Sequence, residues 1–197
     1  MLTLLKDFKI VSIDNDDYKK TKLEKFKNYL FMYKKHKIEL SVSFSVLGFT
    51  KKDNIAILNF GYSVNVLEWV QEKNDYEDQL LNLIPDSSRT KEYIDSKEAR
   101  ELIVRFVEKS VDEYLKKVSP AIVIRGALTE EQINLQRYKR LDTFFLKYGY
   151  QKKIFTVSEN KSLYSIAATK YSGAKYIWAY SKNPSYLDQL NDVMRFY

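Results

Sequence analysis

Four cationic side chains on and before one predicted helix are best suited to chemistry, and the chemistry they indicate is anion binding. Arg125 ends a short apolar segment, and Arg137 and Arg140 lie three residues apart with Lys139 between them. Residues three apart share one side of a helix, so we expect these side chains to converge near Arg125. Arginine binds phosphate and carboxylate groups through paired donors, so phosphate or an acidic protein patch is the expected ligand. The competing interpretation is a surface helix whose arginine stems pack on aromatic rings.

A second group places aromatic rings among lysines near the C-terminus. Its members are Tyr171, Tyr176, Trp178 and Tyr180. Rings beside cations are suited to stacking on single-stranded bases, and tyrosine and tryptophan are equally favoured in protein–protein contacts. The competing interpretation is a strand whose alternating rings pack in the core. Both groups together are the predicted binding residues.

Composition excludes the catalytic and metal-binding chemistry that depends on cysteine or on several histidines. The 197-residue chain has no cysteine, and its one histidine, His36, lies between two lysines. Disulfides, thiolate zinc sites and a cysteine nucleophile are therefore excluded, and so is a multi-histidine site. Asp14, Asp16 and Asp17 lack the glycine and the glutamate of a calcium loop and predict a turn. We expect no catalytic residue, no metal and no cofactor.

The charge is unevenly distributed along the chain. The net charge is +7, and residues 119–197 carry +6 while residues 65–118 carry −4. Such asymmetry is typical of a protein with an anionic partner. However, 26 of the 33 basic residues are lysines, and a lysine excess more often reflects a solvated surface than an anion-binding one.

The first half of the chain predicts mainly strands. Residues 6–13 alternate weakly, which predicts a strand, and the spacing over 18–36 favours a helix. Residues 38–49 alternate serine with apolar residues, and residues 55–64 are apolar on both faces. These two segments predict an antiparallel hairpin whose second strand lies inside a sheet. Residues 65–95 predict an irregular acidic insertion.

A long helix is the clearest element of the second half. Apolar residues recur every three or four positions over 97–118, and Asp95 with Glu98 predicts a capping box at its start. Ser119-Pro120 ends this helix, because the residue before a proline is disfavoured in the α region. The apolar segment 121–125 then predicts a central strand.

A second helix and several strands complete the chain. Thr129 with Gln132 predicts another capping box, and the helix that it opens ends at Gly149. Strands are expected over 150–157, 162–169 and 175–180. A closing helix that runs through Phe196 is expected to begin at Pro184, with Asn183 as its cap.

These elements predict an α+β fold. We expect a mixed or antiparallel sheet with two main amphipathic helices packed on it, in one domain over residues 1–197. The acidic insertion at about 65–95 and an appendage at about 160–197 would elaborate that domain. No apolar run reaches the length of a membrane span, and the N-terminus is too short for a signal peptide, so we expect no membrane and a cytoplasmic location.

The segment from Ile122 to Gly126, followed by residues 134–138 and 141–150, resembles the back half of the acetyltransferase (GNAT) fold. In that family a strand leads to a helix with arginine and tyrosine, which ends near a glycine. The resemblance implies GNAT-like topology and an acyltransferase-like activity. The family's acetyl-coenzyme-A loop contains glycine, because backbone amides must approach a pyrophosphate closely. Here that place is residues 91–96, which contain no glycine, so we expect no binding of acetyl-coenzyme A.

A second resemblance is to small uncharacterised proteins of tailed phages. It is carried by Ser41 to Val46, Lys116 to Pro120, Arg137 to Leu141 and Gly149-Tyr150, and covers roughly 38–64 and 96–155. It implies a phage or mobile-element origin and no known chemistry.

Together these observations predict a non-catalytic protein that binds a host or phage macromolecule through a basic and aromatic surface. A counter-defence inhibitor fits this description, and the location would be the cytoplasm of the host cell. A protein is the favoured partner. The alternatives are a single-stranded nucleic-acid-binding protein and a degenerate acyltransferase-like enzyme. The sequence sets no oligomeric state.

Overall fold

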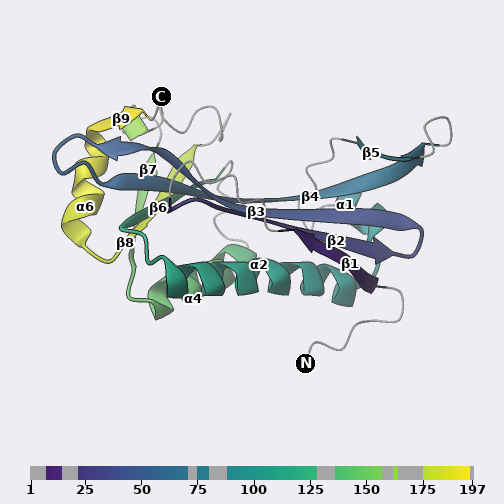
Figure 1. Cartoon of the computed structure of the whole chain (residues 1–197). Coiled ribbons are helices and arrows are strands. Elements are labelled where there is room, and N and C mark those ends of the chain that lie inside the picture. The colour runs from purple at the N-terminus through teal and green to yellow at the C-terminus, as the bar shows by residue number, and fades with distance from the viewer. Residues whose placement is uncertain are drawn as a thin grey trace. The chain divides into compact units, whose positions relative to one another are not determined.

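The structure is a computed structural model that describes residues 8–14, 22–70, 75–79, 88–127, 136–156, 162–163 and 175–195. Its strands are β1 (Phe8–Asp14), β2 (Lys25–Tyr33), β3 (His36–Thr50), β4 (Ala56–Val70), β5 (Asp75–Gln79), β6 (Ile122–Ala127), β7 (Gln151–Thr156), β8 (Tyr176–Ser181) and β9 (Val193–Arg195). Its helices are α1 (Ser88–Tyr93), α2 (Lys97–Lys117), α4 (Gln136–Lys147), α6 (Pro184–Asp188) and the 3-10 turn η1 (Gln189–Asn191). The predicted α+β class with a mixed sheet is confirmed (Figure 1).

Hydrogen bonds join the strands in the order β1-β2-β3-β4-β6-β8-β7, with β5 on β4 and β9 on β3. The chain divides into two compact units. The first comprises Met1–Tyr18, Lys25–Ser43 and Gly61–Ser110, and the second comprises Lys19–Glu24, Phe44–Phe60 and Val111–Tyr197. β3, β4 and α2 each contribute residues to both units. The single domain over 1–197 stays a prediction.

In the first unit, two antiparallel pairs confirm one prediction and correct another. β1 pairs with β2 from Phe8 opposite Tyr33 to Asp14 opposite Asn28, with an irregularity between Ile10 and Ser12, so the strand expected near 6–13 is confirmed. β5 pairs with β4. The expected irregular insertion over 65–95 is therefore wrong for the end of β4, for β5 and for α1, which are regular elements.

The helix predicted over 18–36 is wrong for the part that the structure describes, because residues 25–33 form β2. Tyr29, Phe31 and Tyr33 are buried, so their period is two. Tyr29 and Tyr33 are also four residues apart, and that spacing fits a helix as well as a strand. Only two residues join β2 to β3, and Lys34 has φ 53, as a tight hairpin turn requires.

The core of the first unit forms where α2 packs on β2. The Phe106 ring lies 4.9 Å from the Tyr29 ring and 5.1 Å from the Phe31 ring, measured between centroids. A 2.7 Å hydrogen bond between the Tyr29 and Ser110 hydroxyls satisfies both buried groups. All four side chains are buried, which confirms the helix predicted over 97–118 and its apolar stripe.

In the second unit, β6 is a central strand, as predicted. It runs parallel to β4, with Ile57 opposite Ile122, and antiparallel to β8, with Ile122 opposite Ser181. Parallel neighbours need a crossover connection, and α2 lies within the connection between β4 and β6. Ser119, with φ 47, follows the end of α2 at the place the sequence predicts.

Helical segments pack on both faces of the β6–β8 pair. On one face, the Phe145 ring of α4 stacks 4.2 Å from the Tyr180 ring. On the other face, Leu187 of α6 and Leu190 of η1 join a buried cluster with alternate strand residues. Those strand residues are Ile122, Ile124, Ile177 and Ala179. Adjacent residues of a strand point to opposite faces, so one short strand supplies both layers.

Three predicted features lie at or near the ends of α4. Gly149 has φ 79, and its N–H bonds to the carbonyl oxygen of Leu146, so the predicted helix end is confirmed. Residues 162 and 163 form a helical turn, so the strand expected there is wrong for these two. The capping box at Thr129 and Gln132 and the rest of the strand expected over 162–169 lie outside the described residues.

The closing helix begins as predicted but ends early. Asn183 accepts a 3.1 Å hydrogen bond from the Ser185 N–H, and Pro184 is the first helical residue. Helix α6 ends at Asp188, and β9 then pairs with residues 48–50 of β3, so the expectation of a helix through Phe196 is wrong. Figure 1 shows α6 and β9 beside the β3–β4 turn, where Lys51 Nζ lies 2.5 Å from Asp192.

We expect Phe106→Ala to lower the free energy of unfolding by about 3–5 kcal/mol, because the lost ring leaves a cavity against Tyr29 and Phe31. Leu146→Ala is the control. Its side chain is 55% exposed, so its truncation should cost less than about 1 kcal/mol. Urea unfolding followed by circular dichroism measures both. Equal losses in the two variants would contradict the packing described for α2.

Candidate functional site

Asp142 of α4 is the centre of a largely buried polar cluster in the second unit. Its Oδ1 accepts hydrogen bonds from Arg125 Nη2 at 2.9 Å and from the Tyr180 hydroxyl at 2.5 Å. Its Oδ2 accepts one from Lys152 Nζ at 2.6 Å. The Arg125 side chain is 5% exposed and that of Asp142 is 16% exposed. The cluster therefore joins one helix to β6, β7 and β8.

Trp178 completes the cluster by facing both cations. Its ring centroid lies 4.2 Å from the guanidinium carbon of Arg125 and 4.3 Å from Lys152 Nζ. Cation–π attraction is larger when the partners are desolvated, and Trp178 is fully buried. The two cations are held by a carboxylate and by an aromatic ring together.

Strand register explains why these residues meet. Across β8, Arg125 lies opposite Trp178 on one side, and Ile154 lies opposite Trp178 on the other. Lys152 lies opposite Tyr180 in the same way. Opposed residues share one face of the sheet, and this is the face on which α4 packs.

Burial fixes Tyr180 as a hydrogen-bond donor. Desolvation raises the pKa of its hydroxyl well above the usual value, and the neighbouring Asp142 carboxylate raises it further, against the opposing effect of Arg125. The phenol therefore keeps its proton at neutral pH and donates it to Asp142. In this arrangement Tyr180 stabilises an anion and does not act as a base.

The structure brings together three of the predicted binding residues, namely Arg125, Trp178 and Tyr180. All three are buried, whereas Lys139 and Arg140 of α4 are exposed and Tyr176 is half-buried. Arg137 lies in α4, but its side chain is outside the description. Tyr171 lies outside the described residues.

Sequence reasoning missed Asp142 and Lys152. Residues 132–187 are strongly basic and contain only two acidic residues, Asp142 and Glu159. Asp142 also lies three residues after Lys139, on the same side of the helix. That isolation was the available signal. Lys152 carries no such signal, because its role depends on the register with Tyr180.

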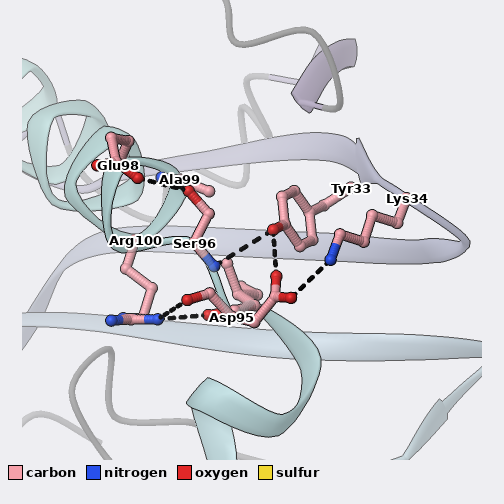
Figure 2. A network of polar contacts seen from close by, with 8 residues as sticks. Tyr33, Lys34, Asp95, Ser96, Glu98, Ala99 and Arg100 are labelled. Carbon is pink, nitrogen blue, oxygen red and sulfur yellow. Dashed lines mark hydrogen bonds and ion pairs between the residues drawn. The ribbon is translucent and has the colours of Figure 1, made fainter.

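A second polar network, in the first unit, ties the β2–β3 turn to the start of α2 (Figure 2). The Tyr33 hydroxyl donates to Asp95 Oδ1, and Lys34 Nζ lies 2.6 Å from Asp95 Oδ2. Ser96 Oγ accepts from the Ala99 N–H at 3.2 Å, so Ser96 caps the helix. The predicted capping box of Asp95 and Glu98 is wrong, because Asp95 is engaged by Tyr33 and Lys34.

Three amides at this helix start, those of Ser96, Ala99 and Arg100, have partners within the protein. The Ser96 N–H donates to the Tyr33 hydroxyl at 3.3 Å, and the Arg100 N–H donates to the Ser96 carbonyl at 3.2 Å. Arg100 Nη1 also donates to the carbonyl oxygens of Ile94 and Asp95. A phosphate at a helix N-terminus needs amides that point at it. Here the protein's own groups bind the amides of Ser96, Ala99 and Arg100.

Comparison with protein-family models, with curated proteins and with solved structures finds no match for this chain. In the described part of the chain, no three carboxylate or imidazole side chains form a group that could hold a metal ion. No helix among the described residues is long and apolar enough to cross a membrane.

We expect Asp142→Asn to lower the free energy of unfolding by about 3 kcal/mol, because it leaves Arg125 buried without its carboxylate. Asp188→Asn is the matched control. Asp188 holds Lys153 at 2.7 Å in the same way, but its side chain is 72% exposed. Its loss should be below about 1 kcal/mol. Chemical denaturation compares them, and equal losses would show that the Asp142 cluster does not stabilise the fold.

Stability should fall between pH 4 and pH 2. Hydrogen bonds from Lys116 and Tyr148 lower the pKa of Asp112 from 3.8 to about 2, and those from Lys34 and Tyr33 do the same for Asp95. A carboxylate whose pKa is lower in the folded state stabilises the fold above its unfolded pKa. That contribution disappears as the pH falls through the folded pKa.

Urea midpoints measured at pH 5, 3 and 2 test this, with Asp112→Asn as the comparison. The variant should lose less stability than the wild type over that range, because it lacks one of the titrating groups. Parallel losses in both proteins would contradict the assignment of this pH dependence to Asp112.

Proposed function

We propose that this protein is a non-catalytic binding protein whose partner is an acidic protein surface or segment. The contact region is the α4 basic surface, defined as Lys139, Arg140 and Lys152. This region adds Lys152 to the predicted binding residues and leaves out Trp178 and Tyr180, whose rings are buried. As in the sequence analysis, the proposal includes no cofactor and favours a protein as the partner.

The observation that carries the proposal is the charge around Asp142. Arg125 and Lys152 already share this single carboxylate, and Lys139 and Arg140 lie exposed within one turn of it on α4. Among the described residues, Asp142 therefore has two cations bound to it and two more within one turn of it. Carboxylates of a partner would be attracted to the exposed cations, and such attraction mainly accelerates encounter and sets specificity.

Burial of the aromatic rings favours a protein partner over single-stranded nucleic acid. Stacking on bases requires an accessible ring face. Trp178 and Tyr180 are fully buried, and both are engaged with Arg125. The exposed cations that remain suit discrete carboxylates at least as well as a continuous phosphate backbone.

A phage or mobile-element origin and GNAT-like topology belong to the same proposal. The order of hairpin, long helix, strand, helix and strand supports the topology. The Ser96 and Ala99 amides at the start of α2 are bound by the protein's own hydroxyl groups, which supports a fold without the family's cofactor chemistry. A counter-defence inhibitor that acts in the cytoplasm of the host cell is one such function.

Charge reversal tests the proposal. We expect the double variant Lys139→Glu, Arg140→Glu to bind a fluorescent polyglutamate peptide at least about tenfold more weakly than the wild type, with a flatter salt dependence. Fluorescence anisotropy at two salt concentrations measures this, and circular dichroism checks folding. The fold should survive, because exposed charges contribute little to stability.

The matched control is Lys51→Glu, Lys52→Glu, which reverses two adjacent exposed cations at the β3–β4 turn. Equal weakening in both double variants would indicate attraction by net charge alone and would overturn the α4 basic surface. Tighter binding of a thymidine oligonucleotide than of polyglutamate would replace the protein partner with a nucleic acid.

Acetyl-coenzyme A should not stabilise the protein. A ligand that binds the native state raises its melting temperature, so we expect no shift at millimolar cofactor. A shift of several degrees would support the acyltransferase alternative.

A further inference from the structure

β7 is the edge strand at one end of the strand order β1-β2-β3-β4-β6-β8-β7. Its inner edge pairs with β8 along its whole length, from Gln151 opposite Ser181 to Thr156 opposite Tyr176. Within the described residues, no strand pairs with its outer edge. A free edge of this kind presents a row of backbone N–H and C=O groups that can pair with another extended chain.

Two consecutive lysines make this edge basic on both faces. Lys152 lies on the face of α4, where Asp142 holds its Nζ at 2.6 Å. Lys153 lies on the opposite face, where Asp188 of α6 holds its Nζ at 2.7 Å. Both lysines remain accessible, with side chains 24% and 43% exposed. The next residue, Ile154, is an aliphatic side chain that is 47% exposed.

We propose that β7 binds an extended acidic segment of a partner protein as an added strand. This rests on the proposed function and specifies how the partner binds. Main-chain hydrogen bonds to the outer edge would supply affinity, and cross-strand pairs would supply specificity. Lys152, Lys153 and Ile154 are consecutive, so their neighbours on the added strand are two adjacent acidic residues followed by one apolar residue.

The charges on the edge favour this occupant over a second copy of the chain. Self-pairing of β7 would place its lysines near those of the other copy, and like charges on paired strands are destabilising. Lysines on an edge strand are a common protection against such association. An acidic strand meets the opposite condition, and Lys139 and Arg140 of α4 add attraction on the Lys152 face.

A short peptide tests the added strand directly. The probe is a capped peptide Thr-Thr-Val-Glu-Glu-Val-Thr-Thr, whose central four residues have the same order in both directions. Two further versions carry backbone N-methyl groups at alternate positions, one at the odd and one at the even residues. Alternate amides of a strand point to opposite edges, so only one methylated version should lose binding, by at least about tenfold.

Variants of the protein give a second readout. Lys153→Glu should weaken binding of the unmethylated peptide at least about tenfold. Lys51→Glu is the matched control, because it reverses a lysine of similar exposure, 52% against 43%, that is also paired to an aspartate, Asp192, at the β3–β4 turn. Its affinity for the peptide should stay within about twofold of the wild type. Circular dichroism checks both variants, and the methylated peptides test the wild type should Lys153→Glu unfold.

The outcomes separate this inference from the proposed function. If both methylated peptides bind as well as the parent, no ladder forms and the added strand is overturned, while the α4 basic surface stands as long as its own charge reversal weakens binding. If none of the peptides binds but polyglutamate does, strand addition fails alone. If neither binds, both proposals fail. A thymidine oligonucleotide that displaces the peptide and binds more tightly would also overturn the added strand.

Discussion

One largely buried carboxylate, that of Asp142, determines much of the second unit. Removing a guanidinium group from water costs several kcal/mol unless an anion and hydrogen bonds compensate. Asp142 supplies that anion for Arg125 and Lys152, and it also accepts from Tyr180. Because these partners lie on β6, β7 and β8, the position of α4 on the sheet is tied to the neutralisation of charge beneath it.

This constraint also decides which cations can meet a partner. Arg125 is buried inside the fold, where its guanidinium group binds Asp142 and lies over the ring of Trp178. A residue chosen from sequence for phosphate or carboxylate binding therefore performs that task within the molecule, with Asp142 as the anion. The cations that a partner can reach are the exposed ones of α4 and the partly exposed lysines of β7, and the cluster around Asp142 holds these two elements together.

The sequence predicts those elements whose periodicity is unambiguous. The alternation in β3 fits only a strand, the apolar stripe of α2 fits only a helix, and the glycine after α4 fits a helix end. The structure has the expected element at each of these places. β2 was mistaken because Tyr29 and Tyr33 satisfy both periods, and only pairing with β1 and β3 decides between them. For the candidate site, the sequence predicted Arg125, Trp178 and Tyr180 but not Asp142 or Lys152, again because tertiary contacts decide. Local spacing locates Arg125, but its contact with Asp142 depends on how α4 packs on the sheet.

An Asp–Tyr–Lys trio recurs at three places in the described chain, and burial decides what each trio does. Asp95 binds Tyr33 and Lys34 at an exposed turn, Asp112 binds Tyr148 and Lys116 at a half-buried surface, and Asp142 binds Tyr180 and Lys152 in the interior. Solvent screening makes the contribution of the first trio the smallest, whereas low dielectric strengthens the third and makes its loss costly. The same chemistry therefore fixes a hairpin to a helix at one site and neutralises a core cation at another. A chain with one histidine and sixteen tyrosines uses phenol donors in all three trios, and burial raises the pKa of each of these hydroxyls, so the donors stay neutral at physiological pH.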